Sequence, residues 1–161
     1  MSEREERWGT DLRLLRNLDR TKSSRDPGND LAVAARLGTG QKDSEARLVD
    51  LETLTGSENL IQALLLRFLT PVGEMAVLGH PDYGSRLAEL IGELNSETNR
   101  NRAKLYVLQS LAAEPRVKEV RSVQVTQSRR DPVQMDIAVS LVAIDNDTPI
   151  NLVFPFFLSE E

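Results

Sequence analysis

The stretch that most constrains the fold of this chain is a long apolar helix followed by a glycine-rich turn and a second long helix, between Thr55 and Arg116. In the segment 58–70, apolar side chains recur at helical spacing and predict one wide buried face. Its residues are Leu60, Ile61, Leu64, Leu65 and Phe68. Thr55 and Glu58 have the spacing of a capping box, which would satisfy two amides at the helix start.

The end of this helix and the course of the following segment are set by proline and glycine. Pro71 stops the first helix, and glycines at 73, 79 and 84 stand where backbone turns need them. Ser85 is placed to cap a short helix that Gly92 ends, and Asn95 or Ser96 is placed to cap a long one. The later part of the long helix is apolar on nearly every side. We therefore expect its own sheet to cover one face and another chain to cover the other.

From Val117 onward the apolar period changes from helical to alternating. Residues 117–126 predict a strand with a bulge, because Val120 is out of phase with Val123 and Val125. Residues 133–143 alternate most clearly, and 150–158 form a third strand after a second short turn. We predict an α+β fold in which about three helices cover one face of a three-stranded antiparallel sheet.

Several separated motifs in this stretch resemble one known family. They are the Gln-Ala-Leu-Leu-Leu-Arg helix at 62–67, the Leu-Gly-His-Pro-Asp-Tyr-Gly-Ser turn at 78–85, and Glu114-Pro115-Arg116. In this order they resemble the sheath-initiator, or baseplate wedge, family of contractile phage tails and related injection machines. The resemblance covers residues 48–145.

The resemblance implies a structural, non-enzymatic baseplate component that joins the baseplate core to the first sheath ring. It implies about six copies around the baseplate. The partners would be the sheath protein, the baseplate wedge proteins with their helical core bundle, and the tube or hub proteins. The matching Glu114, Pro115 and Arg116 are implied to contact the core bundle. From the residues alone, an internal salt bridge or a helix-end cap is an equal alternative for Glu114 and Arg116.

The last strand would offer the sheath an edge. Pro155 donates no hydrogen bond, so its strand is expected at an edge, with the nitrogen turned away from the existing ladder. The amides of Val153 and Phe157 would then point outward, and those of even-numbered residues inward. We predict strand addition here, with sheath contacts at Leu152, Val153, Phe154 and Phe157.

The first part of the chain carries weaker signals. We interpret residues 1–45 as an amino-terminal extension or docking arm and residues 46–161 as the sheath-initiator domain. The apolar cluster from Trp8 to Leu15 would dock as a strand or short helix, with Trp8 contacting either its own domain or a neighbouring subunit. Residues 21–30 have the composition of a loop. Residues 38–44 lack the spacing of a phosphate-binding loop, so we interpret them as a linker.

The sequence offers two candidate sites for enzymatic chemistry. His80, the only histidine, has no partner at metal-ligand spacing and is expected in a backbone-bonded turn. Glu74 and Glu114 are the candidate carboxylate pair for glycoside hydrolysis, because proteins resembling this one are sometimes labelled lysozyme-like. A baseplate-borne muralytic enzyme is therefore the alternative function, and an intracellular adaptor is a third.

Composition bounds these alternatives. The net charge of −5 is spread along the chain without a basic face, which disfavours nucleic acid as a partner. The chain contains no cysteine and therefore no disulfide, which suits synthesis in the cytoplasm. The charged start predicts neither a signal peptide nor a membrane anchor. We expect no cofactor or metal, and a final location in the baseplate of a phage tail or injection particle.

Overall fold

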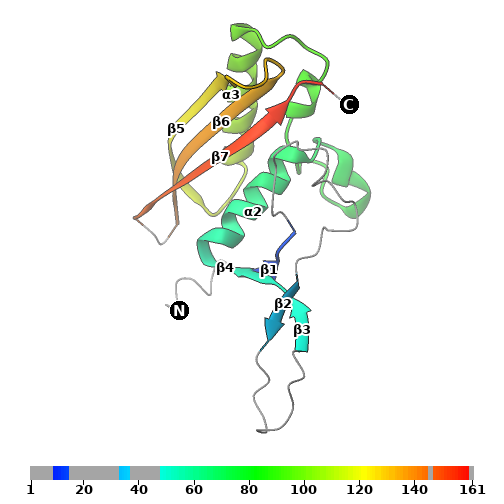
Figure 1. Ribbon diagram of the computed structural model, residues 1–161, viewed down its shortest axis with the longest axis vertical. Coiled ribbons are helices and arrows are strands. Elements are labelled where there is room, and N and C mark those ends of the chain that lie inside the picture. Colours follow the sequence, from blue (N-terminus) through cyan, green and yellow to red (C-terminus); the bar gives the residue numbers. More distant parts are fainter. Residues whose placement is uncertain (1–8, 15–32, 37–47, 145–146, 160–161) are drawn as a thin grey trace, which may run out of the picture. The chain divides into compact units, whose positions relative to one another are not determined.

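The computed structural model describes residues 9–14, 33–36, 48–144 and 147–159. The chain divides into two compact units, Met1–Gln62 and Ala63–Glu161, and the helix α2 (Gly56–Leu69) begins in the first and ends in the second (Figure 1). The interpretations of Trp8, of the loop 21–30 and of the linker 38–44 lie outside the described residues.

The first unit contains two small antiparallel ladders. Strand β1 (Thr10–Leu12) pairs with β4 (Thr53–Thr55), and β2 (Val33–Arg36) pairs with β3 (Leu48–Leu51). The side-chain amide of Gln62 on α2 joins this unit, because its Oε1 accepts from the Leu14 amide at 2.8 Å and its Nε2 donates to the Leu12 carbonyl at 2.7 Å. Of the two conformations expected for the segment after Trp8, the structure therefore has the strand.

The start of α2 differs from the predicted capping box. The helix begins at Gly56, which has a φ of +61°, directly after β4. The carboxylate of Glu58 contacts Arg13 Nη2 at 3.0 Å instead of reaching back to Thr55. The prediction was wrong because a charged side chain from the β1 segment, far away in the sequence, competes for Glu58 more strongly than a backbone amide does.

The second unit is built on the predicted three-stranded antiparallel meander (Figure 1). Strands β5 (Val117–Gln127), β6 (Gln134–Ala143) and β7 (Pro149–Phe157) lie in sequence order. The expected irregularity is confirmed, since the β5–β6 register shifts between Val117 and Glu119 and again between Val120 and Ser122. Alternate residues of β6 and β7 are buried, so one face of the sheet carries the core.

Two α-helices cover this face. The Phe68 ring of α2 stacks on Phe154 of β7, with ring centroids 5.2 Å apart and planes 10° apart. Helix α3 (Glu97–Ala112) lies behind β5 and β6 in Figure 1 and contacts β5. The predicted first-helix face is confirmed at Leu60, Leu64, Leu65 and Phe68, all under 9% exposed.

The expected third helix is a short 3-10 helix. Helix η2 (Leu87–Leu90) is four residues long, and a second 3-10 helix, η1 (Glu74–Leu78), lies in the glycine-rich loop. The N-cap of η2 is Arg86 and not the predicted Ser85, although the Ser85 hydroxyl, one residue earlier, accepts from the Leu87 amide at 3.2 Å. Gly92 follows too closely, with a φ of +90°, for a full α-helical turn to form.

The long helix α3 starts with Ser96 as its N-cap, whose hydroxyl accepts from the Asn99 amide at 3.2 Å. Its inward face is buried at Ala103, Tyr106, Val107 and Leu111. On the outward face Leu105 is 51% exposed. The prediction that another chain covers this outward face is not tested by these contacts and stays a prediction.

Gly84 fixes the loop between α2 and η2. Its φ is +115°, and a Cβ built there would lie 2.6 Å from the Thr70 carbonyl oxygen and 2.8 Å from that of Pro71. This close approach lets Ser85 donate its amide to Thr70 O at 2.8 Å and accept from the Val72 amide at 3.0 Å. Only glycine allows the two ends of the loop to meet in this way.

Leu64→Asp is expected to unfold the domain or to lower its melting temperature sharply. Leu64 is fully buried, so the substitution places an unpaired carboxylate in the core at a cost of several kcal/mol, a large part of a typical total stability. Thermal unfolding followed by circular dichroism measures the effect. Leu69→Asp, at the last residue of α2 and 42% exposed, is the control and should melt close to the wild type. Equal melting of wild type and Leu64→Asp would contradict the assigned face.

Candidate functional site

The corner between α3 and β5 holds the Glu-Pro-Arg motif. The Glu114 amide donates to the Leu111 carbonyl at 3.2 Å, and the Val117 amide donates to the Glu114 carbonyl at 3.0 Å, so the chain turns within four residues. Pro115 cannot continue the helix and is exposed at the turn. This geometry directs the Glu114 side chain inward, where it is 6% exposed.

The Glu114 carboxylate is paired within the second unit. Its Oε1 accepts from Arg116 Nε at 2.7 Å and from the Arg116 amide at 3.3 Å. Its Oε2 lies 3.6 Å from Arg67 Nη2 of α2. The internal salt bridge between Glu114 and Arg116, one of the roles considered for these residues, is therefore present in the structure. The Arg116 side chain remains 27% exposed, so contact with a partner stays a prediction for this residue.

The two arginines change the acidity of Glu114. Burial alone would raise the pKa of its carboxyl group, because the charged form loses solvation. The hydrogen bond and charge of Arg116, with the charge of Arg67, outweigh burial and hold this pKa below its ordinary value. Glu114 is therefore a charged structural anchor, opposite in character to a carboxylic acid kept protonated near neutral pH.

Arg67 connects this ion pair to the glycine-rich loop. Its guanidinium lies over the Tyr83 ring, 4.6 Å from the ring centroid, while its Nη2 faces Glu114. Arginine suits this double role because a planar guanidinium can stack on an aromatic face and still meet a carboxylate. Three motifs that are separated in the sequence, the α2 arginine, the loop tyrosine and the Glu-Pro-Arg corner, thus form one cluster.

A second candidate surface is the edge of β7 that lies opposite β6, its paired neighbour in the described part of the chain. Asp136 lies opposite Pro155 in the register. Proline has no amide hydrogen, so this is a non-hydrogen-bonded pair, and the neighbouring pairs of Phe154 and Phe156 exchange the ladder bonds. The Leu158 amide, in the same phase as Phe154, donates to Val133 at 3.0 Å. The amides of Val153 and the other odd-numbered residues therefore point away from β6.

The four predicted sheath-contact residues differ in their surroundings. Leu152 and Phe154 are 5% and 0% exposed, with side chains in the core. Val153 is 70% exposed, and Phe157 is half-buried. Any contact that Leu152 and Phe154 make with an added strand would therefore pass through the backbone, whereas Val153 offers both its side chain and its amide.

The two edges of the sheet are unlike each other. Strand β5 carries Lys118, Glu119 and Arg121 together with its register shifts, which are features that discourage another strand from pairing. Strand β7 carries no charged residue between Pro149 and Phe157, and its pairing with β6 runs without a shift. The β7 edge lacks the charges and register shifts of β5, and its protection against pairing is limited to Pro149 and Pro155.

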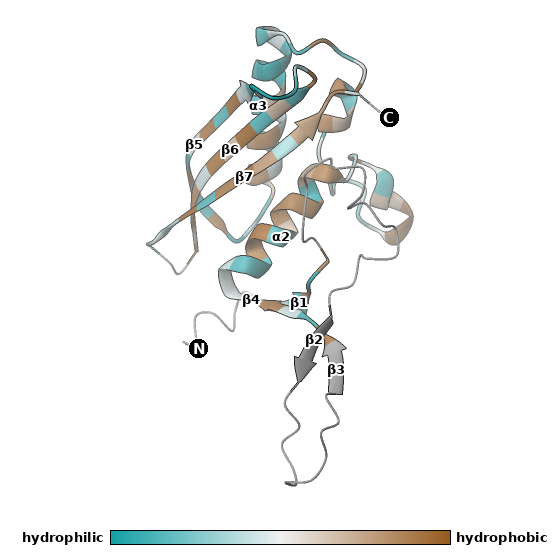
Figure 2. Cartoon of the chain, viewed as in Figure 1, coloured by the Kyte–Doolittle hydropathy of each residue, from teal (hydrophilic) through white to brown (hydrophobic). Residues whose placement is uncertain are grey.

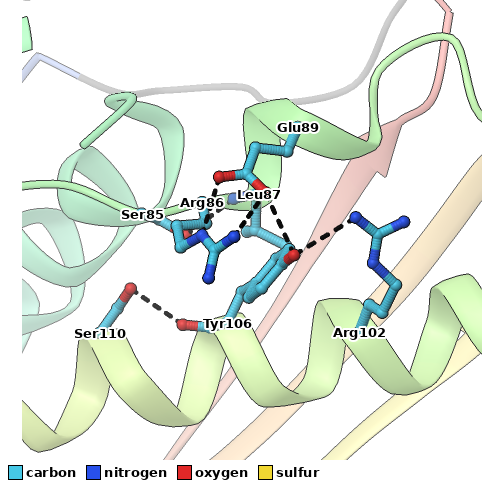
Figure 3. Close-up of polar contacts among 7 residues, drawn as sticks. All are labelled: Ser85, Arg86, Leu87, Glu89, Arg102, Tyr106 and Ser110. Atoms are coloured by element: carbon cyan, nitrogen blue, oxygen red, sulfur yellow. Dashed lines mark hydrogen bonds and ion pairs between the residues drawn. The ribbon is translucent and has the colours of Figure 1, made fainter. Parts of the chain in front are cut away.

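A polar network around Tyr106 joins η2 to α3 and was not predicted from the sequence (Figure 3). The Tyr106 hydroxyl donates to Glu89 Oε2 at 3.2 Å and accepts from Arg102 Nη2 at 3.4 Å, while Arg86 lies over the ring at 4.8 Å. The hydrogen bond from Arg86 holds the pKa of Glu89 below its ordinary value. The sequence does show two pairs at helical spacing, Arg102 with Tyr106 and Arg86 with Glu89. It gives no indication that the two pairs contact each other in the fold.

Two of the residues considered for chemistry, Glu74 and His80, lie in the glycine-rich loop. The His80 amide donates to the Met75 carbonyl at 3.1 Å and the ring is exposed, as is Glu74. Within the residues that the structure describes, no three metal-ligating side chains come together. A groove of about 300 Å³ between α3 and β5 includes neither glutamate; its lining is Arg100, Asn101, Lys104, Val123, Gln124, Val125 and Thr126. Among the described helices, none is long and apolar enough to cross a bilayer.

Comparison with known proteins gives a match in fold. A crystal structure of a protein from Geobacter sulfurreducens, described as a "putative tail lysozyme", matches with a TM-score of 0.57 and 24% sequence identity. The match covers 65% of this chain and 92% of that one. No protein-family profile matches the chain, and no curated protein matches it.

Glu114→Gln is expected to lower the melting temperature at neutral pH and to weaken its dependence on acid. Because the pKa of Glu114 is lowered by folding, its stabilising effect is present above the unfolded pKa and is lost as the pH falls through the folded one. Melting curves recorded from about pH 7 downward through the ordinary glutamate range, near about pH 4, measure this. Glu119→Gln, at an exposed position of β5, is the control. An acid transition of Glu114→Gln identical to that of the wild type would contradict the assigned role.

Proposed function

We propose that this protein is a structural baseplate component of a contractile tail or injection machine, and that the β7 edge templates the first sheath ring. Two independent lines support the tail assignment. The fold is shared with a protein described as a "putative tail lysozyme", and the helix, turn and Glu-Pro-Arg motifs resemble the sheath-initiator family in their order. Partners in this proposal are the sheath protein, baseplate wedge proteins, and tube or hub proteins, around about six copies of this chain.

The observation that carries the sheath role is the uncharged and regular edge of β7 around Asn151 and Val153. Within the part of the chain that the structure describes, β6 is the strand paired with β7, and the edge on the other side of β7 has no charged residue at Asn151 or Val153 and no register shift. These features favour the addition of a partner strand at this stretch. Pro149 and Pro155 share the outward phase, so both place their missing amides on the open side. Between them Asn151 and Val153 supply the outward donors, which limits an added strand to a short, defined stretch.

The Glu-Pro-Arg corner has a supporting role in this proposal. Glu114 is 6% exposed, and its 2.7 Å ion pair fixes the position of Arg116. Arg116 and the exposed Pro115 then form a rigid surface that would contact the helical core bundle. A preorganised arginine loses less conformational entropy on docking than a free one does.

Val153→Pro is expected to give a folded protein that fails to nucleate sheath on purified baseplates. The substitution removes one outward donor without touching the β6–β7 ladder, whereas Phe154→Pro breaks the ladder and deletes a buried ring, at about 3 kcal/mol or more. Sedimentation of sheath with baseplates and electron microscopy measure nucleation. Val153→Ala keeps the amide and is the matched control that should nucleate sheath. Normal sheath on Val153→Pro baseplates would exclude strand addition at this edge.

A muralytic enzyme remains the second candidate function, favoured by the description of the matching Geobacter protein. The lowered pKa of Glu114 and its pairing with two arginines argue against it as the proton-donating acid of glycoside hydrolysis. We expect the purified protein to release no soluble fragments from peptidoglycan in a dye-release assay. Release that is abolished in Glu74→Gln or Glu114→Gln would establish the enzyme and overturn the structural assignment.

A further inference from the structure

The glycine-rich loop ends in an apolar tip that the protein does not use in its own core. This tip consists of Val77 and Leu78, which are 96% and 71% exposed. Helix η1, which carries both, buries no residue at all. Figure 2 shows apolar colour on this turn beyond the carboxyl end of α2. Single exposed apolar residues are ordinary, but two adjacent ones on a projecting turn indicate a surface that is covered in an assembly.

The loop that carries this tip is held in one conformation. Its neck is closed by the Ser85–Thr70 and Val72–Ser85 backbone hydrogen bonds, at 2.8 and 3.0 Å. Within it, amides of Ala76, Gly79 and His80 donate to carbonyls of the same turn at 3.0 to 3.1 Å. Most of the ordering entropy is therefore already lost in the free protein, so burying the tip against a partner would give a larger net gain.

The charges around the tip indicate what kind of partner fits. Residues 71–84 contain the acids Glu74 and Asp82 and no lysine or arginine. Both acids are exposed. An anionic lipid surface would repel this loop, since peripheral membrane segments need cationic residues beside the apolar ones. A protein pocket that is apolar at its centre and basic at its rim complements both features.

We infer that the Val77–Leu78 tip inserts into an apolar, basic-rimmed pocket of another protein of the particle. This inference rests on the proposed function for the identity of the particle, and it assigns a contact separate from the β7 edge. Glu74 and Asp82 steer the approach, and the two apolar side chains provide the buried area. Tyr83, fixed under Arg67, holds the loop to the Glu114 corner, so the tip and Arg116 are presented by one rigid frame.

The experiment supplies purified variants to baseplates from a producing strain that lacks this gene. Val77→Ser/Leu78→Ser is expected to melt like the wild type and to bind these baseplates at least about tenfold more weakly, because two apolar side chains lose their burial. Leu94→Ser removes a leucine that is 82% exposed in the loop before α3, and this matched control should bind like the wild type. Glu74→Lys/Asp82→Lys should also bind more weakly, with a smaller dependence on salt.

Each other outcome overturns the inference in a recognisable way. Equal binding of Val77→Ser/Leu78→Ser and wild type would show that the tip is not a contact. A large drop in its melting temperature, absent in Leu94→Ser, would show that the tip is covered by its own chain. Flotation of the wild type with phosphatidylserine vesicles, or a dimer in sedimentation that the double variant abolishes, would identify a membrane or a second copy instead. If the wild type itself fails to enter baseplates, the proposed function falls, and this contact falls with it.

Discussion

The second unit depends on one buried carboxylate, because Glu114 holds together segments that the sequence keeps far apart. Arg67 comes from α2, Glu114 from the end of α3, and Arg116 from the first residues before β5. If the buried Glu114 carboxylate lost either arginine, the free energy of unfolding would fall by several kcal/mol. The ion pairs therefore hold α2, the corner and the start of β5 in fixed positions relative to one another. Through Tyr83 the same constraint reaches the glycine-rich loop, and so both proposed docking features near the corner are positioned by it.

Apolar packing then orients the sheet relative to the second half of α2. The stack of Phe68 on Phe154 sets the phase of β7, because Phe154 must face the helices. Once this phase is set, the alternation of side chains along a strand places the Val153 side chain on the face away from the core. The Val153 amide then points away from β6. The position of the proposed sheath contact is thus a consequence of core packing one residue away.

The sequence alone predicted those parts of the fold that local pattern determines. Alternation over 133–143 and helical spacing over 58–70 each report a single buried face, and both were found. The capping box at Thr55 failed, and the Tyr106 network was missed, for the same reason: each depends on a residue distant in the sequence, Arg13 in one case and Glu89 in the other. The internal pairing of Glu114 with Arg67 and Arg116 also needed the fold, since Pro115 fixes a corner without fixing which side faces the core.

The turn motif at 78–85 combines two physical tasks, and the structure separates them by residue. Gly84 and Ser85 close the neck, where a side chain at 84 would collide with the Thr70 carbonyl, and Tyr83 anchors the loop to Arg67. Leu78, with Val77 before it, contributes nothing to that architecture and remains exposed. A chain that needed only to connect α2 to η2 could do so with polar residues. The presence of a rigid neck beside an exposed apolar tip is explained if the loop is a contact surface, because a rigid loop loses less conformational entropy on docking.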